Sequence, residues 1–490
     1  MNRTKSLISM LLAVLMLFTA AIPAFATEEL SEEEILVDVD IAPLEEQWND
    51  TEEATRGITM NPGKTESERN FSWYMDEGVT SCAVEISENE DMSDAKSFAG
   101  EIITTYQGDK SAKVTVTDLE ENKTYYYTCV SGEEKSKVYS FTTEDATFSA
   151  LYMSDIHICY SDEETDKLKN TSLAFAELLE KAKGKADINM ILSGGDMATE
   201  GLRIEYEGLT FSDASRELTF ATILGNHDRH SFDYKYFKNL PNELFGPMSG
   251  YQSGNYYFEK GGVLFLCVDT NNASATAHRD MIKEAVKAHP DAKWRVVMMH
   301  HDLYGGSLPH RETENNLLRI LFSPIFDEFN IDLVLMGHSH HYSVSNVIYN
   351  GENVEAMENG KTVKNAKGTV YFTSTSVARP EEAEDETEVT YSDWVGIGMD
   401  ELADSYYNII DFSPEAITVT SYYLDTNEEY ISFTLEKDDD YEPAKIGFFR
   451  KLGGILAAKL STLYGIYVNA DRYFELKEEG FEVGFFEFVF

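Results

Sequence analysis

Runs of apolar residues alternate with segments of helical periodicity from residue 147 onward. Continuous apolar runs are typical of strands buried on both faces, whereas apolar residues three and four positions apart are typical of amphipathic helices. We expect helices at 165–182, 275–289 and 311–329. We expect strands at 148–155, 186–196, 218–228, 294–302 and 331–341, a hairpin at 256–270, and further strands at 368–375, 406–413, 416–424 and 430–436. Two mixed sheets packed together and flanked by helices accommodate all of these elements.

The preceding segment, residues 57–145, has a different pattern. Short segments of alternating apolar and polar residues are separated by Gly, Asn, Asp and Ser, which predicts an all-β sandwich. Its stretch DLEENKTYYY resembles the tyrosine-corner region of fibronectin type III domains. No histidine precedes His157, so we interpret this segment as a spacer or docking module.

The N-terminus has the pattern of a secretory signal peptide. Arg3 and Lys5 precede an apolar stretch from Leu7 to Ile22, and Ala24–Ala26 follows it. Residues 1–26 are therefore predicted to direct the protein outside the cell or to its surface, with an uncleaved membrane anchor as the alternative. Residues 27–56 are acidic and are interpreted as a linker or loosely attached arm.

The C-terminal tail, residues 438–490, contains apolar residues at helical spacing from 445 to 468, with four basic residues and no acidic one. Two interpretations remain open: a helix that contacts a membrane surface or partner, and a helix docked on the protein's own acidic body. The acidic insertion at 380–404 is either a rim loop over a site or a solvated excursion.

Composition narrows the classes of partner. The chain has 490 residues, of which 42% are hydrophobic, enough for two domains with sizeable cores. Its 40 basic and 87 acidic residues give a formal charge of −47, which disfavours a nucleic-acid partner. Four cysteines are too few for a disulfide framework, and whether Cys82 and Cys129 pair is left open.

Five predicted strands end in polar residues that bind metals or move protons. These ends are Asp155-Ile156-His157, Asp196, Asn226-His227-Asp228, His300-His301 and His338-Ser339-His340. Open α/β sheets place their sites at the carboxyl ends of strands, so we expect the five ends to converge. Aspartate, asparagine and histidine suit Zn, Mn or Fe and lack the thiolates of a structural zinc site.

Together these motifs resemble the five-block signature of the calcineurin-like metallophosphoesterases. The resemblance covers residues 148–436, and with the β-sandwich in front the layout is most similar to purple acid phosphatases. It implies a four-layer α/β/β/α sandwich over 146–437 holding two metal ions side by side. The implied ligands are Asp155, His157 and His340 for one ion, Asn226, His300 and His338 for the other, and Asp196 as the bridge.

The resemblance also implies catalytic roles. A metal-bound hydroxide would be the nucleophile, His227 would assist as a non-ligand group, and Asp228 would orient His227. Candidate substrate contacts are Arg229, His230, His310, Tyr391 and Trp394. His301 is left out of the ligand set because strand geometry would point it to the opposite face.

One departure concerns the metal. Purple acid phosphatases carry a tyrosine ligand three positions after the bridging aspartate, where this sequence has Thr199, and they usually have a small residue where it has His157. The protein is therefore expected to lack the iron–phenolate colour, and the two divalent or trivalent ions can be Fe, Mn or Zn.

The leading hypothesis is a secreted hydrolase of phosphate esters, phosphomonoesters first. The alternatives are a phosphodiesterase or nucleotidase acting on nucleotides or cell-wall diesters, and a surface-binding protein with a vestigial metal site.

Overall fold

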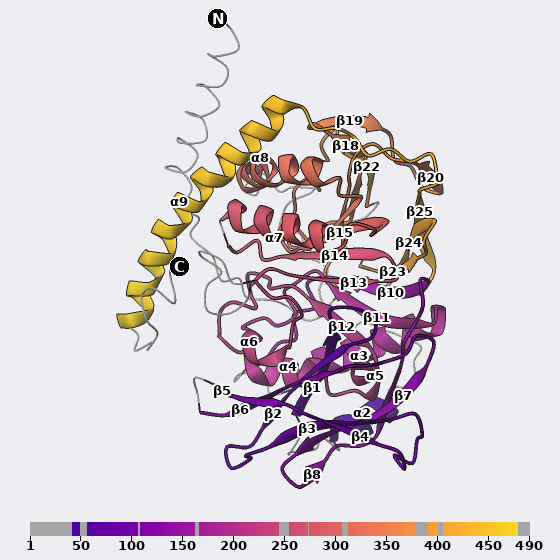
Figure 1. Ribbon diagram of the computed structural model, residues 1–490, viewed down its shortest axis with the longest axis vertical. Helices are drawn as coiled ribbons and strands as arrows, with labels where there is room; N and C mark the ends of the chain where they lie inside the picture. The colour runs from indigo at the N-terminus through magenta and orange to yellow at the C-terminus, as the bar shows by residue number, and fades with distance from the viewer. Residues whose placement is uncertain are drawn as a thin grey trace, which may run out of the picture.

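The computed structural model describes residues 42–49, 56–105, 108–161, 166–244, 254–272, 274–305, 312–377, 391–399 and 405–478. Two parts are stacked along the long axis of Figure 1, an all-β part formed by the N-terminal residues and a larger α/β part. The long helix α9 runs along one side of the larger part.

The N-terminal part is a sandwich of two antiparallel sheets, as the alternating pattern predicts. The strand orders are β1-β2-β6-β5 and β4-β3-β7-β8, with β9 paired to β7. The hydroxyl of Tyr125 accepts a hydrogen bond from the backbone N–H of Glu120 at 2.9 Å, which is the contact expected of a tyrosine corner. The strands are β1 Arg56–Pro62, β2 Arg69–Met75, β3 Cys82–Ser87, β4 Lys96–Ala99, β5 Glu101–Thr104, β6 Lys110–Val116, β7 Thr124–Ser131, β8 Glu134–Lys135 and β9 Tyr139–Thr142.

The α/β part contains the two mixed sheets expected from the sequence, each with seven strands. The first has the order β12-β11-β10-β23-β24-β25-β20 and the second β13-β14-β15-β16-β21-β17-β22. The first comprises β10 Phe148–Met153, β11 Ile188–Ser193, β12 Thr219–Thr222, β20 Lys361–Lys364, β23 Tyr406–Phe412, β24 Ala416–Tyr423 and β25 Glu429–Glu436. The second comprises β13 Tyr256–Lys260, β14 Val263–Val268, β15 Trp294–Met299, β16 Leu333–Met336, β17 Ser343–Ser345, β21 Val370–Thr373 and β22 Val395–Gly398. A separate hairpin pairs β18 Val347–Tyr349 with β19 Glu352–Glu355.

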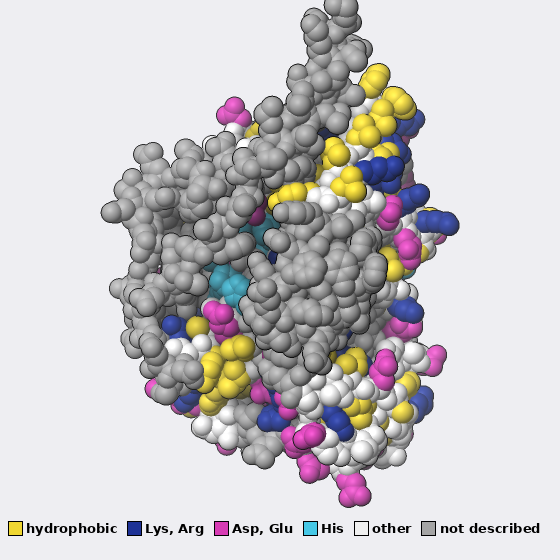
Figure 2. Space-filling view, turned by 90° about the vertical axis from the view of Figure 1, so that its left-hand side faces the viewer, with side chains coloured by type: hydrophobic (Ala, Val, Ile, Leu, Met, Phe, Trp, Pro, Cys, Tyr) yellow, Lys and Arg dark blue, Asp and Glu magenta, His cyan; other side chains and the backbone are white. Residues whose placement is uncertain are grey.

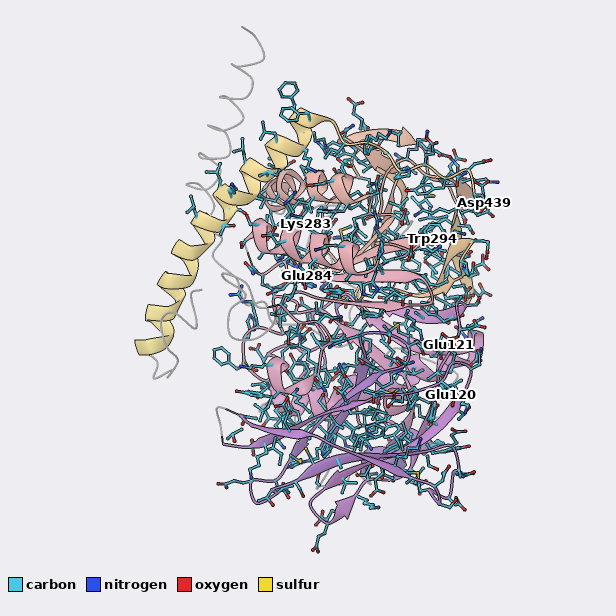
Figure 3. All side chains as sticks on the ribbon, in the orientation of Figure 1. Glu120, Glu121, Lys283, Glu284, Trp294 and Asp439 are labelled. Carbon is cyan, nitrogen blue, oxygen red and sulfur yellow. The ribbon has the colours of Figure 1, made fainter. Side chains whose placement is uncertain are left out.

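Helices cover the outer face of each sheet, which confirms the four-layer α/β/β/α sandwich. The main core lies between the sheets and joins residues such as Tyr152 and Phe265; Trp294, labelled in Figure 3, is buried in it. A second core packs one helix layer on the first sheet, and a third packs the other on the second sheet. The helices are α3 Lys167–Lys185, α4 Arg203–Leu209, α5 Asp213–Glu217, α6 Tyr234–Phe237, α7 Ala275–Ala288 and α8 Glu312–Phe329.

The β-sandwich is fastened to the α/β part by hydrogen bonds to backbone carbonyls. Lys113 Nζ donates to the carbonyl of Tyr236 at 2.8 Å, and the Ser72 hydroxyl donates to Phe237 at 2.6 Å. The Tyr127 hydroxyl donates to the carbonyl of Arg216 at 2.6 Å. All of these groups are buried, so the sandwich braces the segment that follows Asp228 and acts as a docked module.

The acidic segment before the sandwich is not wholly a loose arm. Helix α2 (Ala42–Asn49) lies within it, and its Leu44 is buried in a small cluster with Phe211. Trp48 packs edge-on against the same phenylalanine at 5.1 Å between ring centroids. The prediction of a loose arm is therefore wrong for 42–49, because two apolar side chains dock the helix despite its acidic context.

Helix α9 (Phe448–Glu478) forms the tail, and the predicted signal peptide and residues 479–490 lie outside the described residues. The docked-helix interpretation holds for one face, since Ala457 and Ala458 are buried against α7 and α8. Within the described part of the chain, no helix combines the length and apolarity required to cross a bilayer.

All four cysteines are buried free thiols. Cys82 and Cys129 lie on the paired strands β3 and β7 but do not form a disulfide. Burial raises the pKa of both thiols, so these groups behave as small apolar core residues.

Candidate metal centre

The five polar strand ends converge where the two sheets meet. Strands β10, β11 and β12 run parallel in the first sheet, as do β14, β15 and β16 in the second, so their carboxyl ends lie at one edge. The backbone N–H of His338 donates to Asp155 Oδ2 at 2.9 Å and connects the two sheets. The expected convergence is confirmed.

The backbone at these ends is unusual. Five of the predicted ligands have left-handed φ angles, which non-glycine residues rarely adopt. Such strain persists only where surrounding structure enforces it, and it clusters at functional sites. The five are Asp155 (55°), His157 (50°), Asp196 (49°), His338 (70°) and His340 (58°).

The first group of ligands contains Asp155, His157 and His340, whose donor atoms lie within 4.8 Å of one another. Burial opposes ionisation of Asp155, but the imidazole of His340 at 3.2 Å holds the pKa of that carboxyl well below its usual range. Burial lowers the pKa of His157 to about 3, so its ring is neutral. The buried Nε2 of His157 has no hydrogen-bond partner, which leaves its lone pair for a metal ion.

The second group contains Asp196, His300 and His338, again within 4.8 Å. The ring of His300 is fixed because Nδ1–H donates to the carbonyl of Gly194 at 2.8 Å. Its Nε2 then faces Asn226 Oδ1 at 2.9 Å and Asp196 Oδ2 at 3.1 Å. Burial would lower the pKa of His300, but Asp196 raises it to about 9.

Glycine 225 is required by the close approach of two strand ends. A Cβ at this position would lie 2.0 Å from Asp196 Oδ1 and 2.2 Å from the Asp196 backbone nitrogen. The loop is also held from the second sheet, because Asn271 Nδ2 donates to the carbonyls of Leu224 and Gly225 at 3.0 and 3.2 Å. Because a larger residue at position 225 would collide with Asp196, the glycine allows the loop that carries Asn226 to lie beside Asp196.

The donor set fits a pair of metal ions. Two clusters of aspartate and histidine lie side by side: the backbone N–H of His157 in the first donates to the carbonyl of Asp196 in the second at 3.0 Å, and the amide oxygen of Asn226 extends the second. Hard and borderline oxygen and nitrogen donors of this kind suit Fe, Mn or Zn, and a carboxylate has two oxygens with which to bridge.

His227 stands beside the first group without belonging to either. Its ring packs edge-on against His157 at 4.8 Å. Its Nδ1 lies 2.9 Å from the backbone carbonyl of Thr199, and its backbone N–H donates to Asp196 Oδ1 at 2.8 Å. His227 belongs to neither group of candidate ligands, and its catalytic role stays a prediction.

Asp228 does not orient His227, contrary to the sequence expectation. Its carboxylate accepts from the backbone N–H groups of Met197, Ala198 and Gly225 at 3.0 to 3.3 Å, and from the Tyr206 hydroxyl at 3.1 Å. Burial and the charge of Asp196 raise the pKa of Asp228 to about 6. It supports the loop that carries Asp196.

Two of the five candidate substrate contacts lie near His227. Arg229 and His230 are exposed, and the ring of His230 is 5.3 Å from that of His227. Burial raises the pKa of Asp269 to about 6, and the positive charge of Arg229 opposes this rise. Their contact with substrate stays a prediction.

The other three candidates are placed differently, and His310 lies outside the described residues. The Tyr391 hydroxyl donates to the carbonyl of Tyr342 at 3.0 Å, and Trp394 packs edge-on against Tyr304 at 5.5 Å. Both rings serve packing within the second sheet layer.

His301 lies closer to the site than strand geometry predicts. Its ring is 4.5 Å from that of His338, and its Nδ1 is 2.7 Å from the hydroxyl of Thr270. The strand ends at Met299, so the alternation of faces no longer applies. Glu314 from α8 completes a third cluster with these two histidines, and nothing in its helical context signals that.

Asp269–Asn272 form a sixth polar strand end, where the sequence pattern predicts only the end of a hairpin. Asn271 bonds the loop before Asn226, and Thr270 bonds His301. The sequence contains the pattern that predicts such an end, because these polar residues also follow a buried apolar strand, β14.

Residues 148–342 match the family model of the calcineurin-like phosphoesterases. Residues 55–143 match that of the purple acid phosphatase N-terminal domain. The chain carries a calcineurin-like phosphoesterase domain behind a purple acid phosphatase N-terminal domain. The metallophosphoesterase core thus comprises the strand ends described above.

Curated proteins similar to this chain include purple acid phosphatases of plants. Purple acid phosphatase 15 of Arabidopsis thaliana is 24% identical over 270 residues, 49% of this chain and 50% of the relative. Purple acid phosphatase 1 of Ipomoea batatas is 23% identical over 318 residues, 58% of this chain and 63% of the relative. The Fe(3+)-Zn(2+) purple acid phosphatase 12 of Arabidopsis thaliana is 23% identical over 268 residues, 48% of this chain and 53% of the relative. The chain thus matches between half and two thirds of the length of these relatives.

Solved structures share the fold. Purple acid phosphatase PPD1 from yellow lupin (Lupinus luteus) seeds superposes with a TM-score of 0.63 at 15% identity, covering 81% of this chain and 78% of that one. PhoD superposes with a TM-score of 0.52 at 12% identity, covering 83% and 97%.

Proposed function

We propose that this chain is a binuclear-metal phosphoesterase that hydrolyses phosphate esters, with phosphomonoesters as the first substrate class. The observation that carries the proposal is the convergence of two groups of metal-binding side chains, one of which contains Asp196, beside the non-ligand His227. The plant relatives named as phosphatases support the same chemistry.

The residues divide the work. When bound, two metal ions supply a water of lowered pKa and clamp the phosphoryl group. Asp196 would bind the ion held by His300 and, with its second oxygen, could reach the other ion, and the Gly194 carbonyl holds His300 in the tautomer that presents Nε2 to Asp196. His227, held at Nδ1 by Thr199, keeps Nε2 for donating a proton to the departing ester oxygen.

We propose Fe, Mn or Zn as the bound metals. Thr199 contributes a hydroxyl 3.4 Å from the carbonyl of His157 rather than a phenolate, and the imidazole of His157 supplies a ligand in its place. Iron in this site would therefore lack the phenolate ligand that gives the purple colour, and one relative is named for an Fe(3+)-Zn(2+) pair.

We also propose that residues 1–26 direct the protein out of the cell and that its substrates are small phosphate esters. The charge of −47 supports the exclusion of nucleic-acid polymers, because a protein lacking basic excess gains nothing from counterion release.

Elemental analysis of the purified protein and hydrolysis of a chromogenic phosphomonoester, compared with the matching diester, test the proposal. Asp196→Ala and Asn226→Ala should each remove at least one metal and nearly all activity, whereas Asp411→Ala, an exposed residue of β23, should change neither. Activity that survives in both site variants would refute a metal mechanism. A faster diester rate would favour the phosphodiesterase alternative, and a metal-loaded protein inactive on a broad ester panel would favour the vestigial site.

A further inference from the structure

Helix α9 has two unlike faces, and one of them is docked. Gly454 lies against Pro324 of α8, where a Cβ would approach to 2.7 Å, and Ser461 accepts a hydrogen bond from the backbone N–H of Ala275 at 3.1 Å. Small residues on this face let the helix lie close to α7 and α8. Arg450 and Lys451 pair with Asp327 and Glu328 of α8 and fix its first turns.

The opposite face presents large apolar side chains to solvent, which we call the apolar stripe. Apart from the adjacent pair Phe448 and Phe449, successive members lie three, four or seven positions apart and so share one side of the helix. A helix on a protein surface normally turns polar residues outward, so this pattern is reversed. The stripe comprises Phe448 (73% exposed), Phe449 (69%), Leu452 (38%), Leu456 (37%) and Leu463 (67%).

The charge around the stripe is also reversed relative to the rest of the protein. No acidic residue occurs between Glu442 and Asp471, although the chain contains 87 of them. Lys445 and Lys459 are exposed beside the stripe. Figure 2, which views the side of the molecule that α9 covers, shows hydrophobic side chains interspersed with basic ones. An acidic protein is repelled by an anionic surface, so this face is the one suited to approach it.

The composition of the stripe favours lipid over a second copy of the chain. Lys459 lies between Leu456 and Leu463 in the helix and is exposed. If two copies paired through their α9 helices, the lysine of each copy would enter the apolar contact. At a bilayer interface, by contrast, lysine extends its charged end to the headgroups while its stem stays among apolar neighbours. Phenylalanine and leucine, which make up the stripe, are the residues that such helices bury in the bilayer interface.

We propose that α9 docks this protein on an anionic lipid surface by inserting the apolar stripe into the headgroup–acyl boundary. The stripe and the docked face are on opposite sides of one helix, so binding lipid requires no rearrangement of the α/β part. Histidine side chains are visible on the same side of the molecule in Figure 2, so docking holds that side toward the surface.

Sedimentation of the full chain with vesicles tests the proposal. We expect binding to vesicles of phosphatidylglycerol and phosphatidylcholine in equal parts, and an affinity about a hundredfold or more lower for F448S/F449S/L463S. Lys459→Gln should weaken binding about fivefold on these vesicles and leave binding to phosphatidylcholine alone unchanged. The matched control V138S/V354S removes two apolar side chains that are 43% and 50% exposed elsewhere, and it should bind like wild type.

Thermal unfolding followed by circular dichroism shows that each variant is folded, and neither measurement requires phosphatase activity. Equal binding of wild type and the triple serine variant would overturn the proposal. The proposal would also be overturned if the wild type did not bind vesicles and light scattering showed it to be a dimer, with the triple variant a monomer. The stripe would then bind a second copy of the chain.

Discussion

His227 and Thr199 are joined by a hydrogen bond of 2.9 Å from the imidazole Nδ1 to the backbone carbonyl. A carbonyl only accepts, so Nδ1 carries the hydrogen and Nε2 is the atom that remains for proton exchange. Thr199 occupies the position at which purple acid phosphatases carry a ligand tyrosine. In this chain its backbone, rather than its side chain, serves the site.

Substitution of His227 by alanine should lower kcat without loss of metal, because the ring is not in either ligand group. We expect a fall of about 10²–10³-fold on a phosphomonoester, the range for removal of a general acid. The measurement is steady-state kinetics alongside elemental analysis. His289→Ala, which removes an imidazole packed edge-on against Tyr257 at the end of α7, is the matched control and should leave kcat unchanged. Loss of metal in His227→Ala would instead make the residue a ligand.

Substitution of Asp228 by alanine should destabilise the protein and deplete its metal. Three backbone N–H groups and the Tyr206 hydroxyl would lose a buried acceptor, at a cost of about 2–4 kcal/mol in the free energy of unfolding. Tyr206→Phe removes only the last of these bonds and should cost about 1 kcal/mol. Urea unfolding and metal content distinguish this role from orientation of His227. If Asp228→Ala had normal stability and metal content and changed only the pH–rate profile, Asp228 would instead orient His227, as the sequence predicts.

The fold and most of the ligand set are accessible from the sequence because both depend on local patterns. Each polar cluster follows an apolar run, and strands joined by helices must place their carboxyl ends at a common edge. That is sufficient to bring Asp155 beside His340 and Asp196 beside His300, which are far apart in the chain.

Contacts made after a strand ends are not accessible in the same way. Strand alternation predicts the wrong face for His301, because the alternation of side chains stops where the strand ends at Met299. The sequence predicts that Asp228 orients His227, because a carboxylate commonly fixes an imidazole tautomer, whereas its carboxylate accepts from amides of the loop after β11. Such choices depend on which buried N–H groups need an acceptor, and only the packed structure reveals that.

Glycine 225 permits a direct test of how closely the two strand ends approach. In Gly225→Ala the new methyl group would overlap Asp196 Oδ1 and its backbone nitrogen, so the bridging carboxylate must move. We expect loss of at least one metal ion and a fall in kcat of about 10²-fold or more. Gly184→Ala is the matched control: no atom lies within 4 Å of its added Cβ, and in helix α3 it should be neutral or stabilising by up to about 1 kcal/mol. Equal metal content in the two variants would contradict the geometry.

Metal binding should become tighter as the pH rises toward about 9, because His300 must lose a proton to become a ligand. In the protein from which a chelator has removed the metal ions, Asp196 raises the pKa of His300 from its ordinary 6.5 to about 9. Because the pKa of His300 is higher in the folded than in the unfolded protein, protonation of His300 stabilises the metal-free fold. This stabilisation is complete below the unfolded-state pKa of 6.5 and is lost as the pH rises through about 9. Within that window the group adds up to about a tenfold gain in metal affinity per pH unit, with release of one proton.

Competition titration of the chelated protein with zinc at several pH values measures this slope, and calorimetry in two buffers of different ionisation enthalpy measures the released protons. Asp196→Asn removes the charge that raises the pKa, so its proton release should vanish above about pH 7 even where it still binds one ion. A zinc affinity that does not change across the window would show that His300 is neutral in the chelated protein, and that Asp196 does not hold a proton on it.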